Sequence, residues 1–300
     1  MTLVVAVTAP KSIWLLADRR LSRKGRPPRD DGRKIMFLHT PDGVGILGYS
    51  GLGITALGKE TADWMNAVLL GRSLPLDQSL QVLAAAIQRQ IPRHLARITG
   101  NVGIDHHVLI TAFRGNEFRL YSIHPVIRPD RKAYRFGHTH YVMEPRAGVR
   151  VPARLGICGD GARYLQRNQT WKRPLLHVVR AYDRGAISER AVADHLARLN
   201  YEVHLANPGG SVGPRCIVGW RSRRGGDGGG QQSYTATDRD ADTPSLPMLG
   251  AGTDMTALAG VVMKRLLEAR QAGRPCQDFP ADEVNADLAT LPDKPDEDLR

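Results

Sequence analysis

Three residues near the start of the chain carry side chains that could together perform nucleophilic chemistry, namely Thr2, Asp18 and Lys34. A threonine hydroxyl is a weak nucleophile until a nearby base takes its proton. A threonine at the N-terminus of the mature chain brings its own base, because a free α-amine has an ordinary pKa of roughly 7.7–8.0. A nearby lysine would favour the alkoxide, while an aspartate would orient that lysine and keep it charged. The chemistry requires removal of Met1, and the small residue that follows it favours that removal.

Two hairpins are expected to bring these side chains together. The apolar runs at 2–9 and 12–18 predict antiparallel strands around a turn at residues 10 and 11, and both are typical of strands covered on both faces. In such a hairpin, residues whose numbers sum to about 20 face each other, which places Asp18 opposite Thr2. The simpler interpretation is that Thr2 is a strand residue without a chemical role.

A second hairpin opens at Lys34, turns at residues 41–43 and is expected to return near residues 48–50. Gly51 follows this strand, so its backbone N–H could receive the oxyanion that develops on a substrate carbonyl. A hydroxyl, a carboxylate, an ammonium group and a glycine turn would then meet at one sheet edge. Hydrolysis of an amide needs this set of groups.

The rest of the chain predicts blocks of strands and blocks of helices. Such blocks favour a layered α+β fold over alternating βαβ units. A linker is expected after residue 236, followed by a helix capped by Thr253 or Asp254 and by an acidic tail, so the chain divides into 1–236 and 237–300. The other predicted elements are helices at 54–70, 76–98 and 188–206, hairpins at 106–126 and 215–237, and a strand at 153–158 that turns into a helix.

The chain is basic, with a formal net charge of +12. Such a surface attracts phosphates, nucleic acid or acidic polypeptides, although an arginine-rich but otherwise ordinary surface is the favoured explanation of the charge. The stretch from Gly53 to Lys59 matches G-x-x-x-x-G-K, but Glu60 stands where a phosphate-binding loop needs Ser or Thr. The basic loop 19–34 contains no aromatic residue that could stack on bases, so nucleic acid is not the expected partner.

The number and spacing of the cysteines and the hydropathy of the first residues predict where in the cell the protein is found. The three cysteines are widely spaced, which indicates neither a disulfide framework nor a zinc site and fits a reducing cytoplasm. Pro10, Lys11 and Asp18 interrupt the first apolar stretch, so it predicts neither a signal peptide nor a membrane span. The expected chemistry requires no metal, nucleotide or other cofactor.

The segments TLVVAV, LLADRRLS, RKI and GYSGLG resemble the opening of the proteasome β-subunit family, which includes bacterial heat-shock peptidases that begin with Met-Thr. The family's nucleophile, aspartate, lysine and oxyanion glycine match Thr2, Asp18, Lys34 and Gly51 one by one. The likeness continues through LGICGDGARYL and extends roughly to residue 236, with the middle matched by pattern alone.

Further site residues are implied by this resemblance. Ser22 takes the place of a hydroxyl residue that hydrogen-bonds the substrate backbone, and Leu21 with Tyr49 would line the specificity pocket. Two positions depart from the family pattern. Asp160 stands where a supporting serine is usual, and the segment before Ser211 lacks the customary aspartate.

The resemblance implies a four-layer αββα sandwich of the N-terminal-nucleophile hydrolase type, acting as a threonine peptidase or related amidohydrolase. It also implies a ring-shaped homo-oligomer, a peptide or protein substrate and an unfoldase partner. Membrane association is not expected, because of the interrupted apolar stretch described above. Two alternatives stay open. One is a catalytically silent, assembly-forming homologue, motivated by the departures at Asp160 and Ser211. The other is a phosphate- or nucleic-acid-binding protein, motivated by the charge and by residues 53–59.

Overall fold

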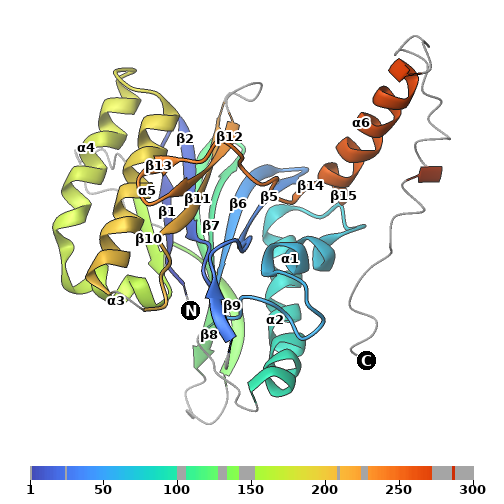
Figure 1. Ribbon diagram of the computed structural model, residues 1–300, viewed down its shortest axis with the longest axis horizontal. Coiled ribbons are helices and arrows are strands. Elements are labelled where there is room, and N and C mark those ends of the chain that lie inside the picture. The colour runs from blue at the N-terminus through green and yellow to red at the C-terminus, as the bar shows by residue number, and fades with distance from the viewer. Residues whose placement is uncertain are drawn as a thin grey trace.

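The first two predicted hairpins form, and each lies within its own β-sheet (Figure 1). The first sheet has the strand order β10-β1-β2-β11-β12-β13, and the second has the order β15-β14-β5-β6-β7-β8-β9. Neighbouring strands are antiparallel except for the parallel pair β14 and β5. Helices pack on these sheets, so the prediction of an α+β fold is confirmed.

The computed structural model describes residues 2–23, 26–99, 106–127, 134–141, 153–207, 210–223, 229–271 and 286–287. Its strands are β1 (Val4–Thr8), β2 (Ser12–Asp18), β3 (Leu21–Arg23), β4 (Arg26–Arg29), β5 (Ile35–Thr40), β6 (Gly43–Ser50), β7 (His107–Arg114), β8 (Glu117–Ile127), β9 (Tyr134–His140), β10 (Arg154–Cys158), β11 (Arg215–Ser222), β12 (Gly229–Thr235), β13 (Asp238–Arg239), β14 (Met248–Gly250) and β15 (Thr253–Asp254). Its helices are α1 (Thr61–Leu69), α2 (Leu76–Thr99), α3 (Asp160–Arg167), α4 (Lys172–Asp183), α5 (Glu189–Ala206) and α6 (Met255–Gln271), with a short 3₁₀ turn at Gln169–Trp171.

Alternation along β2 shows why its sequence is apolar throughout. Trp14 and Leu16 belong to the core between the first sheet and helices α4 and α5. Leu15 and Ala17 belong to the core between the two sheets. The prediction of strands covered on both faces is thus confirmed, and each fully buried leucine of this kind stabilises the fold by about 1.5–3 kcal/mol.

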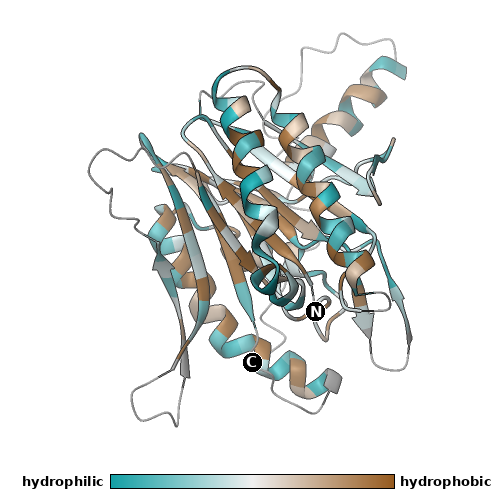
Figure 2. Ribbon diagram, turned by 90° about the vertical axis from the view of Figure 1, so that its left-hand side faces the viewer, coloured by the Kyte–Doolittle hydropathy of each residue, from teal (hydrophilic) through white to brown (hydrophobic). Residues whose placement is uncertain are grey.

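A third core lies on the other side of the second sheet, where α1 and α2 cover it. Trp64 of α1 and Leu80 of α2 pack there against strand residues such as Leu47 and Ile110. Figure 1 shows α4 and α5 on one side of the sheets and α1 and α2 on the opposite side. In Figure 2 the brown, apolar residues gather on the strands, while the helices alternate between brown and teal.

The register of the first hairpin differs by one residue from the expected pairing. Val4 pairs with Ala17, and the N–H of Asp18 donates to the carbonyl of Leu3 at 3.0 Å, so Asp18 lies opposite Leu3 instead of Thr2. The reason is the turn, in which the N–H of Ala9 donates to the carbonyl of Ser12 at 3.0 Å and leaves a two-residue loop.

The first predicted helix begins later than expected. The prediction starts it at residue 54, whereas α1 begins at Thr61 because Ile54 and Glu60 form an isolated bridge that closes residues 54–60 into a loop. Helix α4 does not appear among the predicted elements, and a short β3–β4 hairpin occupies part of the predicted basic loop.

The segment after residue 236 is not a linker throughout. β13 extends the first sheet, and β14 pairs with β5 of the second sheet, so this segment joins both sheets. Helix α6 follows as predicted, and the Asp254 carboxylate caps it by accepting from the N–H groups of Thr256 and Ala257 at 3.0 Å. The division of the chain at residue 236 stays a prediction. The acidic tail lies outside the described residues except for 286–287.

The described cysteines are buried, and the described helices are not of the kind that crosses a membrane. Cys158 and Cys216 are buried and free, and Cys276 lies outside the described residues. Burial raises the pKa of the Cys158 thiol to about 12, so it stays protonated at neutral pH. None of the helices in the described ranges combines the length and the apolar character that crossing a membrane requires.

Candidate active site

Thr2, Asp18 and Lys34 meet beside the start of β1. Lys34 Nζ donates to Thr2 Oγ1 at 2.7 Å and to Asp18 Oδ1 at 3.1 Å, and the hydroxyl of Thr2 donates to the same carboxylate oxygen. Thr2 and Asp18 are fully buried and Lys34 is 3% exposed. Their side chains therefore interact where water does not screen the charges.

The Asp18 carboxylate is held by backbone groups as well as by these side chains. The N–H of Leu3 donates to Oδ1 at 2.8 Å, while the N–H groups of Arg20 and Gly213 donate to Oδ2 at 3.0 and 3.4 Å. Both oxygens are satisfied, so the carboxylate has a fixed orientation. The one-residue shift in register does not break the cluster, because Asp18 reaches Thr2 diagonally across the hairpin.

Lys34 has an acceptor for each proton of an ammonium group. Besides Thr2 Oγ1 and Asp18 Oδ1, its Nζ donates to the carbonyl of Arg20 at 2.7 Å. Burial lowers the pKa of Lys34 below its usual 10.5, and the charge of Asp18 opposes that shift. The three acceptors fit the charged form, which suits a role in stabilising negative charge on the hydroxyl oxygen.

Gly51 follows the last residue of β6, as predicted, and has a φ of 132°, where side chains are strained. It lines a cavity of about 400 Å³ together with Gly159 and Asp160. The turn into α3 closes against Thr2, because the N–H of Gly161 donates to the Thr2 carbonyl at 3.3 Å and a Cβ on Gly159 would lie 2.1 Å from that oxygen. Gly51, the predicted oxyanion donor, thus borders the same cavity as Gly159, the residue that packs against the Thr2 carbonyl.

Asp160 and Ser211 come together on the other side of α3. Both line a second cavity, of about 590 Å³, which Asn207 also borders. Asp160 is the first residue of α3 and lines both cavities, so it is placed at the boundary between them. None of the described hydrogen bonds links Asp160 or Ser211 to Thr2, and their supporting role stays a prediction.

Three predicted substrate-binding residues have different positions. Ser22 is exposed on β3. Leu21 is 5% exposed, and its side chain fills the space beside Gly32 and Gly53, where an added Cβ would lie 2.5 and 2.8 Å from it. Tyr49 is fully buried, so the structure does not place it or Leu21 on the wall of an open specificity pocket.

Tyr49 is buried because its side chain lies on the face of β6 that packs against α1. Its ring packs edge-on against Trp64 of α1 with centroids 6.3 Å apart, and its hydroxyl bonds His106 Nδ1 at 2.9 Å. It therefore contributes to the core between the second sheet and its helices. Alternation along the strand sends its neighbour Ser50 toward the cavity instead.

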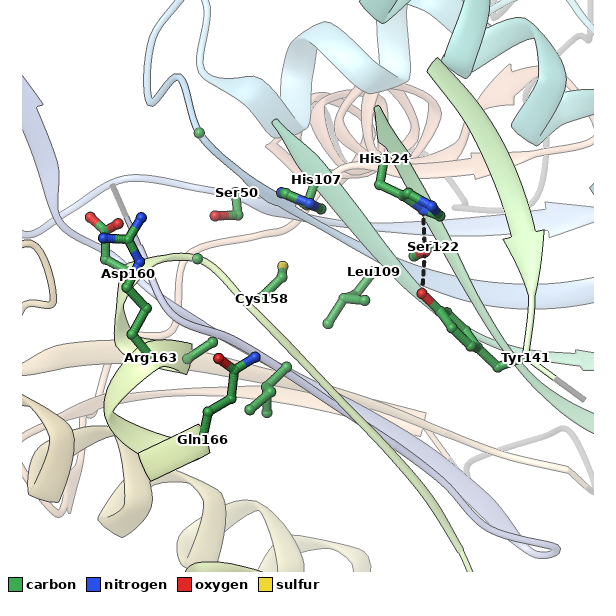
Figure 3. Close-up of a pocket in the computed structure, with 14 residues that line it drawn as sticks. Ser50, His107, Leu109, Ser122, His124, Tyr141, Cys158, Asp160, Arg163 and Gln166 are labelled. Carbon is green, nitrogen blue, oxygen red and sulfur yellow. Dashed lines mark hydrogen bonds between the residues drawn. The ribbon is translucent and has the colours of Figure 1, made fainter. Parts of the chain in front are cut away.

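The cavity beside Gly51 contains a polar group that the sequence prediction missed (Figure 3). Ser122 Oγ bonds His124 Nδ1 at 2.9 Å and the hydroxyl of Tyr141 at 3.0 Å. Ser122 and His124 are two residues apart on β8 and share a face, and this spacing within a predicted hairpin is the signal that could have found them. Tyr141 joins them because β9 pairs with β8.

The loop at 53–59 is not arranged to bind phosphate. Four of its N–H groups donate within the protein: Thr55 to the Lys59 carbonyl, Ala56 to His94 Nδ1, Gly58 to the Thr55 carbonyl and Lys59 to Thr55 Oγ1. The Glu60 carboxylate stands before the first residue of α1 and accepts from Arg33, so an anion would meet a negative charge. The geometry opposes the phosphate-binding alternative at this loop.

Several arginines of the predicted basic loop are paired with acidic residues. Arg20 pairs with Asp30 at 2.9 Å, Arg29 with Asp31 at 2.8 Å, and Arg33 with Glu60 at 3.0 Å. Paired guanidinium groups offer a phosphate backbone less charge than their number suggests.

No family model matches the chain, and no curated protein matches it. Solved structures of Anbu proteins match at low identity. The Gly-1 mutant of Anbu from Hyphomicrobium sp. strain MC1 is 15% identical, with a TM-score of 0.45 over 79% of this chain and 90% of that one. Anbu (ancestral beta-subunit) from Yersinia bercovieri is 12% identical, with a TM-score of 0.42 over 73% and 80%. The helical assembly of the Anbu complex from Pseudomonas aeruginosa is 14% identical, with a TM-score of 0.43 over 98% of each chain.

These comparisons correct the resemblance drawn from the sequence. The assignment to the proteasome β-subunit family was wrong, because neither a family model nor a curated sequence supports it. The resemblance depended on short segments around Thr2, Asp18, Lys34 and Gly51, and four positions are too few to define a family. The geometry of those residues stands independently of that assignment.

Proposed function

We propose that this protein is an amidohydrolase that cleaves peptide bonds with Thr2 as its nucleophile. One observation carries the proposal: the buried Thr2 hydroxyl is hydrogen-bonded to both Lys34 Nζ and the Asp18 carboxylate. A threonine that served only as a strand residue would not need a buried ammonium group and a buried carboxylate, since burying charge is costly.

The proposed reaction begins with cleavage of the bond between Met1 and Thr2, which frees an α-amine. Thr2 Oγ1 then attacks the substrate carbonyl carbon while its proton passes to that amine. The carbonyl oxygen becomes an oxyanion that the N–H of Gly51 receives. The amine of the scissile bond takes the proton and leaves, and water hydrolyses the ester on Thr2.

Lys34 and Asp18 have distinct tasks in this scheme. The ammonium group of Lys34, 2.7 Å from Thr2 Oγ1, stabilises the negative charge that develops on that oxygen. Asp18 offsets the effect of burial on Lys34 and fixes its direction. The reaction needs no metal or nucleotide.

The arrangement of the layers supports the finer description of the fold. Helices α4 and α5, the first sheet, the second sheet, and helices α1 and α2 follow one another through three apolar cores. This order supports a four-layer αββα sandwich of the N-terminal-nucleophile hydrolase type. Peptide or protein substrates, an unfoldase partner and a cytoplasmic location belong to the same proposal.

A second candidate function is that of an assembly-forming protein without hydrolytic activity. Helix α6 favours it, because the apolar side chains of Met255, Met263 and Leu267 are 38%, 55% and 54% exposed. The absence of described hydrogen bonds from Asp160 or Ser211 to Thr2 also favours it. Self-association, whether into a ring or another homo-oligomer, is compatible with both candidates.

A hydrolysis assay separates the two candidates. The purified protein is incubated with a peptide mixture and the products are identified by mass spectrometry. Thr2→Ala should abolish cleavage, because alanine allows removal of Met1 but provides no hydroxyl, while Thr2→Ser should retain part of it.

Thr8→Ala is the matched control, since Thr8 is equally buried on β1 but lies outside the cluster. It should cleave as the unaltered protein does. Cleavage that survives Thr2→Ala would disprove the assigned nucleophile. An unaltered protein that is correctly processed and still cleaves nothing would favour the silent assembly.

A further inference from the structure

We propose that the cavity beside Gly51 is a substrate subsite that binds a carboxylate group, supplied by an acidic side chain or by a free carboxyl terminus. The assignment of the cavity to the substrate rests on the proposed function. The choice of a carboxylate rests on the chemistry of the lining.

The cavity adjoins the turn that packs against the backbone of Thr2, while Thr2 itself is not part of its lining. Its wall includes Gly51 and Gly159, and Gly159 lies against the Thr2 carbonyl. The buried side chain of Leu21, by contrast, fills the space beside Gly32 and Gly53 and leaves no room there. A volume of about 400 Å³ falls in the range of small-ligand sites, so it can hold a substrate side chain.

The polar group formed by Ser122, His124 and Tyr141 has a proton to donate whichever way its hydrogen bonds run. If Tyr141 donates to Ser122 and Ser122 donates to His124 Nδ1, then the neutral imidazole carries its proton on Nε2 as a donor. If the direction is reversed, His124 Nδ1 donates to Ser122, Ser122 donates to Tyr141, and the Tyr141 hydroxyl is left with a proton to donate. If Tyr141 and His124 both donate to Ser122, the Ser122 hydroxyl keeps its own proton to donate. An acceptor such as a carboxylate oxygen satisfies each arrangement.

The residues near this group also favour an anion. His107 stacks beside His124, with ring centroids 6.5 Å apart and an angle of 12° between the planes. Asp160 is the one acidic residue of the described lining, and Figure 3 shows it at the end away from Tyr141. The end that holds Tyr141 therefore has hydroxyl and imidazole groups without a carboxylate that would repel the ligand.

Binding is tested on Thr2→Ala protein, which cannot cleave its probe. Two pairs of short peptides are used, one differing by Glu against Gln and the other by a free carboxyl terminus against a terminal amide. We expect the carboxylate member of one pair to bind about tenfold more tightly, which corresponds to about 1.4 kcal/mol, because a hydrogen bond to a charged group is stronger than one to a neutral group. The pair that shows the preference identifies the source of the carboxylate.

Substitutions in the polar group test whether it is the source of the preference for a carboxylate. Tyr141→Phe and Ser122→Ala should each reduce the preference at least threefold. Tyr164→Phe is the matched control, because Tyr164 is on α3 and lines the other cavity, and it should leave the preference unchanged. Equal binding within both pairs, no binding at all, or a preference that both cavity variants retain would overturn the inference.

The result is independent of catalysis. A protein that cleaves peptides without any carboxylate preference refutes the subsite and leaves the proposed function intact. If the protein shows the preference but never cleaves a peptide, the binding site is supported and the proposed function is refuted.

Discussion

Replacement of Asp18 by asparagine tests the buried cluster most sharply, because it keeps the size of the side chain and removes its charge. Both oxygens of Asp18 accept hydrogen bonds, including those from the backbone N–H groups of Leu3 and Arg20. An amide NH₂ therefore faces another donor whichever way it is turned. Lys34, only 3% exposed, loses its partner charge at the same time.

The expected magnitude follows from this burial. Removing one partner of a buried ion pair costs about 3–5 kcal/mol of unfolding free energy. With a urea m-value of about 3 kcal/mol per M, the midpoint of unfolding should fall by about 1 to 1.7 M. The fluorescence of the fully buried Trp14 and Trp64 reports the transition.

Asp31→Asn supplies the control. The ion pair between Arg29 and Asp31 has side chains that are 62% and 47% exposed, so its loss should leave the midpoint nearly unchanged. If Asp18→Asn moves the midpoint no further than Asp31→Asn, the cluster around Thr2 does not have the buried, charged character described above.

Two further predictions concern the packing around the site. Gly159→Ala should lower stability well beyond Gly185→Ala: both glycines have positive φ, 88° and 79°, but an added Cβ collides with the Thr2 carbonyl only at residue 159. Strain alone should cost Gly185→Ala about 1–2 kcal/mol in urea unfolding, and equal losses would refute the close contact. Burial raises the pKa of Tyr49 above its usual 10.0, so the folded state keeps a proton that the unfolded state loses above pH 10. The free energy of unfolding should therefore fall as the pH rises above 10. The fall should be less steep in Tyr49→Phe than in the unaltered protein. If the two proteins lose stability equally steeply, the Tyr49 side chain is exposed to water.

The hairpins and the cluster could be predicted because they depend on short-range patterns. Two apolar runs around a turn define a hairpin, and a difference of one in the register still leaves Asp18 within reach of Thr2. The approach of Lys34 follows from its place before β5, whose partner strand β6 ends beside the same edge.

Other features depend on contacts between distant segments. The parallel pairing of β14 with β5 joins residues far apart in the sequence, and each strand is too short to give a pattern. Tyr49 was predicted to face the substrate, but the packing of Trp64 against its ring decides its side of the strand. The polar group of Ser122, His124 and Tyr141 could not be predicted, because Tyr141 is brought close to the other two only by the pairing of β8 with β9.

The most direct test of the central claim is mass spectrometry of the purified protein after treatment with an electrophile that reacts with N-terminal threonine. We expect that the chain has lost Met1 and carries a single adduct on Thr2. Lys34→Met should slow the formation of that adduct, and Thr2→Ala should prevent it. A chain that retains Met1, or an adduct that forms equally well without the Thr2 hydroxyl, would contradict the account.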